Sequence, residues 1–130
     1  MDKVIWCDKG FFPLYYGFCP NEKAWFKALK HLKAPSEPYP EADARVTTFT
    51  NLDTGDTVCI VTLNESLDTK CTLGIIGLMA HESVHVKQAL MECINEVNPS
   101  SEFEAYVVQN ILLNLLNAYQ KTRGFLKDRP

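Results

Sequence analysis

The segment from residue 72 to residue 92 constrains the fold most, because it predicts a long helix that is apolar nearly all round. Such a helix is typical of a protein core. Two histidines and a glutamate interrupt its apolar surface, at His81, Glu82 and His85. Burying polar side chains without partners is costly. The fold must therefore provide these three side chains with partners, and a metal ion with a water molecule would satisfy them.

The spacing of the three residues predicts a metal site. Residues four apart lie on one face of a helix, so His81 and His85 can bind one zinc ion side by side. Glu82 lies about 100° around the helix from His81. It therefore flanks the metal, where a general base would take a proton from a water molecule. Gly77, one turn before His81, leaves room there. We predict Zn²⁺ as the cofactor, His81 and His85 as metal ligands and Glu82 as a catalytic residue.

A third ligand is expected from the next helix, because a catalytic zinc site usually has three protein ligands. Glu102 and Glu104 are the candidates, and they lie about 200° apart on a helix, so only one can face the metal. Ser101 and Glu104 match the S-x-x-E capping box, which gives Glu104 a structural role. Periodicity leaves both carboxylates open, and the capping box favours Glu102.

The motif His81-Glu82-x-x-His85, followed by Glu102-x-x-Ala105, resembles that of the gluzincin metallopeptidases. The chain is also similar to small zincin-like proteins encoded by phages and prophages, in which the histidines read H-E-x-x-H-V and the last helix reads E-x-x-A-Y-x-x-Q. The resemblance spans much of the chain, and its specific parts are the H-E-x-x-H and E-x-x-A motifs. It implies a mini-zincin fold with Glu102 as the third ligand.

Two further positions bear on this resemblance. The stretch Tyr16-Gly17-Phe18-Cys19-Pro20 resembles one that precedes the first helix in the phage proteins. Many gluzincins have an aspartate four residues after the ligand glutamate, where it orients a ligand histidine, and this chain has Tyr106 there. We predict Tyr106 as a second catalytic residue that donates a hydrogen bond to the oxyanion. Packing or orienting a ligand is the alternative role for it.

Outside the motif, the chain predicts a single α+β domain over residues 1–130, with 46% apolar residues to form one core. Asn21 caps an N-terminal helix that runs to about residue 33. Residues 45–51 and 57–63 are rich in β-branched side chains and form a hairpin in a small antiparallel sheet.

The two ends of the domain are predicted to differ in secondary structure. Residues 1–20 are rich in aromatic side chains and supply one short strand and an irregular lid. A C-terminal helix at residues 102–121 would carry the third ligand to the helix that bears the histidines.

Composition limits the class of partner and compartment. The formal net charge is −3 and no basic run is present, which argues against nucleic-acid binding. No apolar stretch is long enough to span a bilayer, and the first residues lack the pattern of a signal peptide. The five cysteines are odd in number and lack C-x-x-C spacing, so we expect reduced, mostly buried thiols. We predict a cytoplasmic protein, in the host cytoplasm if it is phage-encoded.

The function that these features predict is hydrolysis of a peptide bond in a peptide or protein substrate. The strand at residues 57–63 would run beside the cleft, where an extended substrate could pair with its backbone. The alternative is a zincin-like regulatory or protein-interaction domain that binds metal without catalysis. A metal-free interaction domain with an accidental motif is a third possibility. The oligomeric state is left open.

Overall fold

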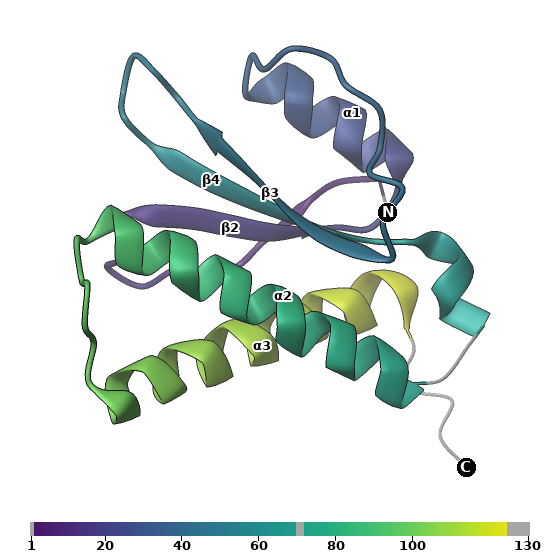
Figure 1. The fold of residues 1–130 in the computed structure, drawn as a ribbon. Helices are drawn as coiled ribbons and strands as arrows, with labels where there is room; N and C mark the ends of the chain where they lie inside the picture. Colours follow the sequence, from purple (N-terminus) through teal and green to yellow (C-terminus); the bar gives the residue numbers. More distant parts are fainter. Residues whose placement is uncertain (1, 70–71, 125–130) are drawn as a thin grey trace.

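A mixed sheet of four strands forms the centre of the computed structural model, which describes residues 2–69 and 72–124 (Figure 1). The strands lie in the order β1-β2-β4-β3. Their bounds are β1 Ile5–Trp6, β2 Leu14–Cys19, β3 Ala44–Thr50 and β4 Thr57–Leu63. The α+β class and the β3–β4 hairpin are confirmed.

The prediction of an antiparallel sheet is wrong, because β2 and β4 pair in parallel from Leu14 opposite Thr57 to Cys19 opposite Thr62. The first twenty residues contain two strands, and the second is central. Parallel neighbours require a long crossover connection. Here the connection from β2 to β4 contains α1, Glu22–His31, and the antiparallel strand β3.

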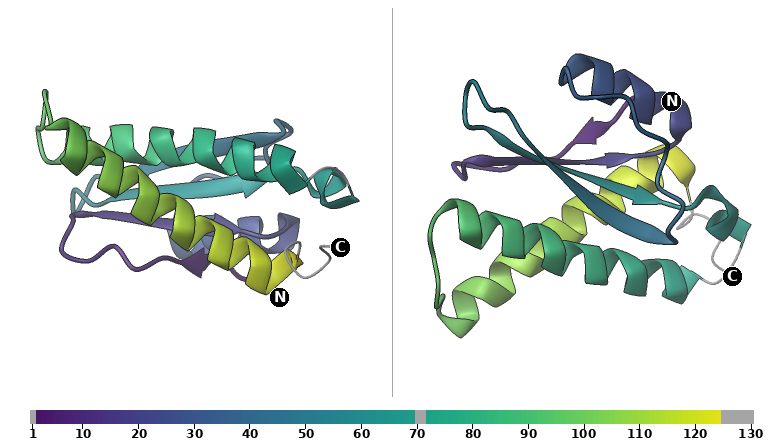
Figure 2. Two further views of the ribbon diagram at one scale, coloured as in Figure 1. Left: turned by 90° about the horizontal axis from the view of Figure 1, so that it is seen from below. Right: turned by 45° about the horizontal axis from the view of Figure 1, so that its top comes forward.

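Helices cover both faces of the sheet. In Figure 1, α1 lies above it, and α2, Thr72–Cys93, and α3, Ser101–Arg123, lie below it. Two further views show α3 crossing α2 on that lower face (Figure 2). Successive residues of β4 point to opposite faces of the sheet. Val58 and Ile60 pack in the core cluster that contains Trp25 of α1, whereas Val61 packs in the cluster that contains Met79 of α2.

The boundaries of the helices follow from local signals. Asn21 caps α1, as predicted, with its side-chain oxygen accepting a hydrogen bond of 2.9 Å from the backbone N–H of Ala24. A short 3₁₀ helix, Glu65–Thr69, leads towards α2. At the end of α3, the Arg123 guanidinium donates to the carbonyl oxygens of Leu63 at 2.8 Å and Asn64 at 3.0 Å. This contact ties the last turn of α3 to the end of β4.

Burial of α2 is confined to one side, which corrects the expectation of a helix buried all round. Ile75, Met79, Val86 and Leu90 are buried. The opposite side is exposed, and its members are Gly74, Gly77, His81, His85 and Gln88. The sheet and α3 cover only the first of these two sides.

The remaining sequence predictions concern thiols and membranes. Cys7, Cys19, Cys59 and Cys93 are free, Cys19 and Cys59 are buried, and Cys71 lies outside the described residues. Over the described ranges, no helix has the length and apolar character needed to cross a membrane.

Candidate metal centre

His81 and His85 lie side by side on the exposed face of α2, as their spacing predicts. Their Nε2 atoms are 3.2 Å apart, and their ring centroids are 4.8 Å apart. Zinc–nitrogen bonds of 2.0–2.1 Å in a tetrahedral site hold two ligand nitrogens about 3.3 Å apart. The two imidazoles therefore already have the separation that one zinc ion requires, and their donor chemistry fits that ion.

The surroundings of the histidine pair leave space for further ligands. A Cβ atom placed on Gly77, one turn earlier, would meet no atom within 4 Å. One turn later, the Nδ1 atom of His85 lies 3.0 Å from the side-chain oxygen of Gln88. The pair is thus open to solvent on one side and has a polar neighbour at the other.

Glu82 occupies a different environment from the histidines that flank it. Its side chain is only 4% exposed and lies against the sheet. Its carboxylate accepts a hydrogen bond from the backbone N–H of Val46 in β3. Burial raises the pKa of Glu82 above its ordinary value, while the charges of His81 and His85 act in the opposite direction. A carboxylate with a raised pKa beside a candidate metal site suits a general base.

Glu102 is not gathered with the histidine pair. It is exposed in the first turn of α3. Across residues 2–69 and 72–124, no three His, Cys, Asp or Glu side chains come together as a metal-binding group. Glu102 as the third ligand therefore stays a prediction.

Glu104 shows which side of α2 this turn of α3 faces. A carboxylate oxygen of Glu104 lies 2.6 Å from the Lys87 ammonium nitrogen, and the lysine side chain is largely buried. Lys87 lies about 200° around α2 from His85. The start of α3 thus packs against a side of α2 that points away from the histidines.

The capping role predicted for Glu104 is wrong. Ser100 is the N-cap of α3, and its hydroxyl accepts a hydrogen bond of 3.3 Å from the backbone N–H of Phe103. Ser101 is already the first helical residue, so it is not the N-cap, and Ser101 and Glu104 do not form a capping box. The side chain of Glu104 instead pairs with Lys87. The capping argument that favoured Glu102 over Glu104 is therefore removed, and the resemblance alone supports Glu102.

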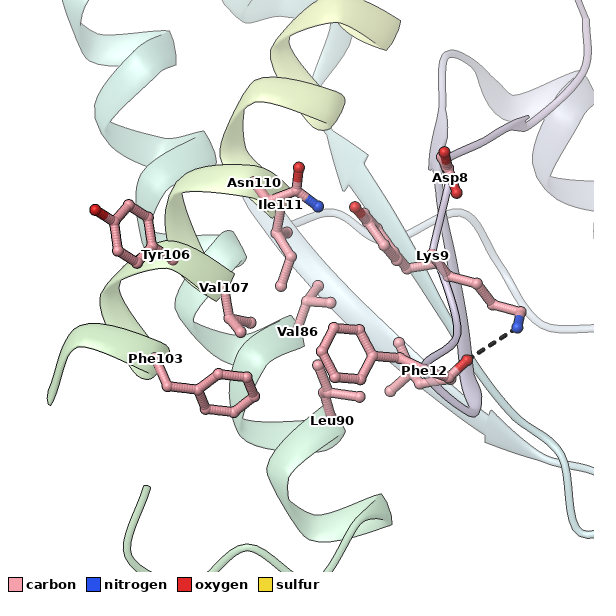
Figure 3. Close-up of a pocket in the computed structure, with 12 residues that line it drawn as sticks. Asp8, Lys9, Phe12, Val86, Leu90, Phe103, Tyr106, Val107, Asn110 and Ile111 are labelled. Atoms are coloured by element: carbon pink, nitrogen blue, oxygen red, sulfur yellow. Dashed lines mark hydrogen bonds between the residues drawn. The ribbon is translucent and has the colours of Figure 1, made fainter. Parts of the chain in front are cut away.

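Tyr106 belongs to the lining of an apolar cavity that the histidines do not line. It is 65% exposed and lies at the rim of an apolar cavity of about 230 Å³, with its hydroxyl pointing away from the interior (Figure 3). The rings of Phe12 and Phe103 stand at the mouth with centroids 6.3 Å apart. Val86 and Leu90, from the buried side of α2, line this cavity. The cavity is therefore a feature of the α2–α3 side and does not contain the histidines.

Two neighbours of the motif were not predicted from the sequence. The contact between Glu82 and Val46 joins residues far apart in the chain, so no local pattern could indicate it. The contact between His85 and Gln88 has a local signal, because residues three apart are neighbours on a helix.

Comparisons of the chain with protein-family models, with curated proteins and with solved structures gave no match.

Proposed function

We propose that this protein is a zinc-dependent peptidase whose histidine pair, His81 and His85, holds the metal. The observation that carries the proposal is the 3.2 Å separation of the two Nε2 atoms, with the buried carboxylate of Glu82 next to them in sequence and packed against β3. When bound, zinc would lower the pKa of a water molecule and polarise the carbonyl of the bond to be cleaved.

Glu82 is the proposed proton carrier. As the general base it takes a proton from the attacking water, and it then passes that proton to the leaving amine. Its raised pKa, caused by burial, brings the carboxyl closer to neutral pH, where both transfers are possible. The interaction with the Val46 backbone places the carboxylate against β3.

The substrate would lie along β3 and not along the strand predicted from the sequence. β4 has hydrogen-bonded neighbours on both sides, β2 and β3, so its backbone is not available for an added strand. β3 is at the edge of the sheet, and Glu82 contacts it. An extended peptide could therefore pair with β3 through backbone hydrogen bonds, next to the histidine pair.

The experiment that tests the proposal is the substitution Glu82→Gln. Zinc content, measured by atomic spectroscopy on purified protein, should match that of the wild type, while cleavage of a peptide library should be lost. Glu92→Gln is the matched control, because Glu92 is an exposed glutamate of the same helix. Zinc-loaded wild-type protein that cleaves no peptide would refute the peptidase proposal.

One observation favours a second candidate function, a metal-binding protein without catalysis. Among the described residues, only the two histidines converge on a metal position. Glu102→Gln and Glu104→Gln separate the possibilities when the zinc affinity of each variant is measured. We propose that Glu102→Gln weakens zinc binding, as a third ligand would. Equal affinity in both variants and the wild type would favour a site of two histidines and hence the non-catalytic function.

A further inference from the structure

We propose that Gln88 is a positioning residue that fixes the proton of His85 on Nδ1 and so keeps Nε2 free to bind the metal. The proposal rests on the zinc site proposed above. It assigns a role to a side chain that does not touch the metal position itself.

The hydrogen-bonding chemistry of the two groups decides which atom carries the proton. The Nδ1 atom of His85 lies 3.0 Å from Oε1 of Gln88. An amide oxygen can only accept a hydrogen bond, so Nδ1 must donate it. A neutral imidazole carries one N–H, and its other nitrogen is an acceptor. The Nε2 atom of His85 is therefore unprotonated, and its lone pair can accept a hydrogen bond or bind a metal ion.

That lone pair is directed towards the proposed ion. The Nε2 atom of His85 is the atom that lies 3.2 Å from Nε2 of His81. A histidine binds a metal through an unprotonated nitrogen, and the hydrogen bond of the other nitrogen decides which one that is. Gln88 thus supplies from within the same helix the acceptor that many metal sites take from a carboxylate or a backbone carbonyl.

The position of Gln88 allows this contact at little conformational cost. Residues three apart are neighbours on a helix surface, and both side chains lie on the exposed face of α2. Within residues 2–69 and 72–124, His85 has such an acceptor on its Nδ1 atom, whereas the hydrogen-bond and ring contacts of His81 are all with His85. The two histidines of the pair are therefore not equivalent: the ring of His85 is oriented by the protein, and the ring of His81 by His85 or the metal.

The first test reads the tautomer without any metal. Nitrogen-15 NMR spectra of metal-free protein at about pH 8.5, where a histidine ring is neutral, distinguish a protonated Nδ1 from a protonated Nε2. The chain has three histidines, so single substitutions assign the signals. We expect His85 to carry its proton on Nδ1 in the wild type, to lose that preference in Gln88→Leu, and to regain it in Gln88→Glu, whose carboxylate also accepts a hydrogen bond.

The second test reads the consequence for the metal. Zinc affinity, measured by competition with a chelator, should fall by about 10- to 100-fold in Gln88→Leu, the range typical of lost partners of metal-binding histidines. Gln88→Glu should restore most of that affinity. Gln120→Leu is the control, because Gln120 is an exposed glutamine of α3, and it should change neither the tautomer nor the affinity.

The outcomes separate this proposal from the one on which it rests. A wild-type His85 protonated on Nε2, or a tautomer unchanged in Gln88→Leu, would overturn the positioning role whatever the metal does. Undiminished zinc affinity in Gln88→Leu would also overturn it, while leaving the zinc site intact. Wild-type protein that shows the expected tautomer but binds no zinc would refute the metal site and, with it, the use of this hydrogen bond.

Discussion

The two sides of α2 differ more than the sequence of that helix suggests. On the buried side, Met79 and Val86 pack into the main core between the sheet and α3. On the exposed side, His81 and His85 face solvent beside the open space at Gly77. Apolar residues occur nearly all round the helix, so the difference arises from what covers it. The sheet and α3 cover one side, and the two histidines lie on the other.

The apolar cavity also lies apart from the exposed side of α2 that carries the histidines. The apolar cavity of about 230 Å³ lies on the α3 side of α2, between Phe12 and Ile111, and the histidine pair lies outside it. The histidine pair has the donor atoms of a metal site but lies on an open surface. The apolar cavity and the histidine pair are separate, because the histidines do not line the cavity, so each can be altered without the other.

The largest effect is expected on the buried side, from Met79→Ala. Met79 is fully buried in the core, and truncation of such a side chain removes packing and leaves a cavity. We expect the free energy of unfolding to fall by about 2–5 kcal/mol, as measured by chemical denaturation. Leu73→Ala in the same helix is the control, because Leu73 is 77% exposed and should change stability by less than about 0.5 kcal/mol. Equal losses in the two variants would contradict the division of α2 into two sides.

On the exposed side, His81→Ala should separate binding from stability. Zinc affinity should fall by more than about 100-fold, because even outer partners of a ligand histidine contribute 10- to 100-fold. The stability of the metal-free protein should change by less than about 0.5 kcal/mol, since the ring is exposed. Titration calorimetry and denaturation together check both expectations. His31→Ala, at the end of α1, should alter neither quantity, and zinc binding that survives His81→Ala would remove the histidine pair as the metal site.

A smaller gain is expected from filling the apolar cavity. Val107 lines it and is 7% exposed, so Val107→Ile adds one methylene group to existing space. A buried methylene contributes about 0.8 kcal/mol, and we expect unfolding free energy to rise by about 0.5–1 kcal/mol. Zinc affinity should not change. Val97→Ile, at an exposed position before α3, controls for the substitution itself, and a loss of stability in Val107→Ile would mean that the cavity has no room for the added group.

Local signals predicted the helices and the hairpin well. Asn21 has the side chain of a good N-cap and is one. The hairpin of residues 45–51 and 57–63 was also identified correctly, and Gly55 adopts a φ of +80° between its two strands. The pairing of His81 with His85 followed from helix geometry alone. In each case, the information lies within a few residues of the feature it predicts.

Features that depend on distant segments were predicted poorly. Nothing near residues 14–19 indicates that they pair in parallel with β4, because the pairing joins segments that are far apart in the chain. The side of α2 that α3 covers depends on the packing of Val107, Ile111 and Leu115 into the core, and the sequence of α2 alone does not indicate it. The predicted N-cap was wrong by one residue, at Ser101 instead of Ser100, because Ser101 matches the S-x-x-E pattern with Glu104 whereas Ser100 has Phe103 at that spacing.

The smallest expected effect is a pH dependence of stability caused by Glu82, which lies between the two sides of α2. Burial raises the pKa of Glu82 above its ordinary value of 4.5, so the folded state holds the carboxyl proton more tightly than the unfolded state does. Stability of the metal-free protein should therefore fall as pH rises from about 4.5 through the pKa of the folded state, and should stay at the lower level above it.

Glu82→Gln tests this dependence, because glutamine does not titrate and its side-chain oxygen can still accept the hydrogen bond from Val46. We expect a flatter profile of unfolding free energy against pH in this variant than in the wild type, whereas Glu92→Gln, at an exposed position of α2, should follow the wild type. Parallel profiles for Glu82→Gln and the wild type would show that burial does not penalise the charged carboxylate. The expected result would show that burying the Glu82 carboxylate against the sheet costs stability. Its proposed role as a general base concerns the histidine pair on the exposed side of α2.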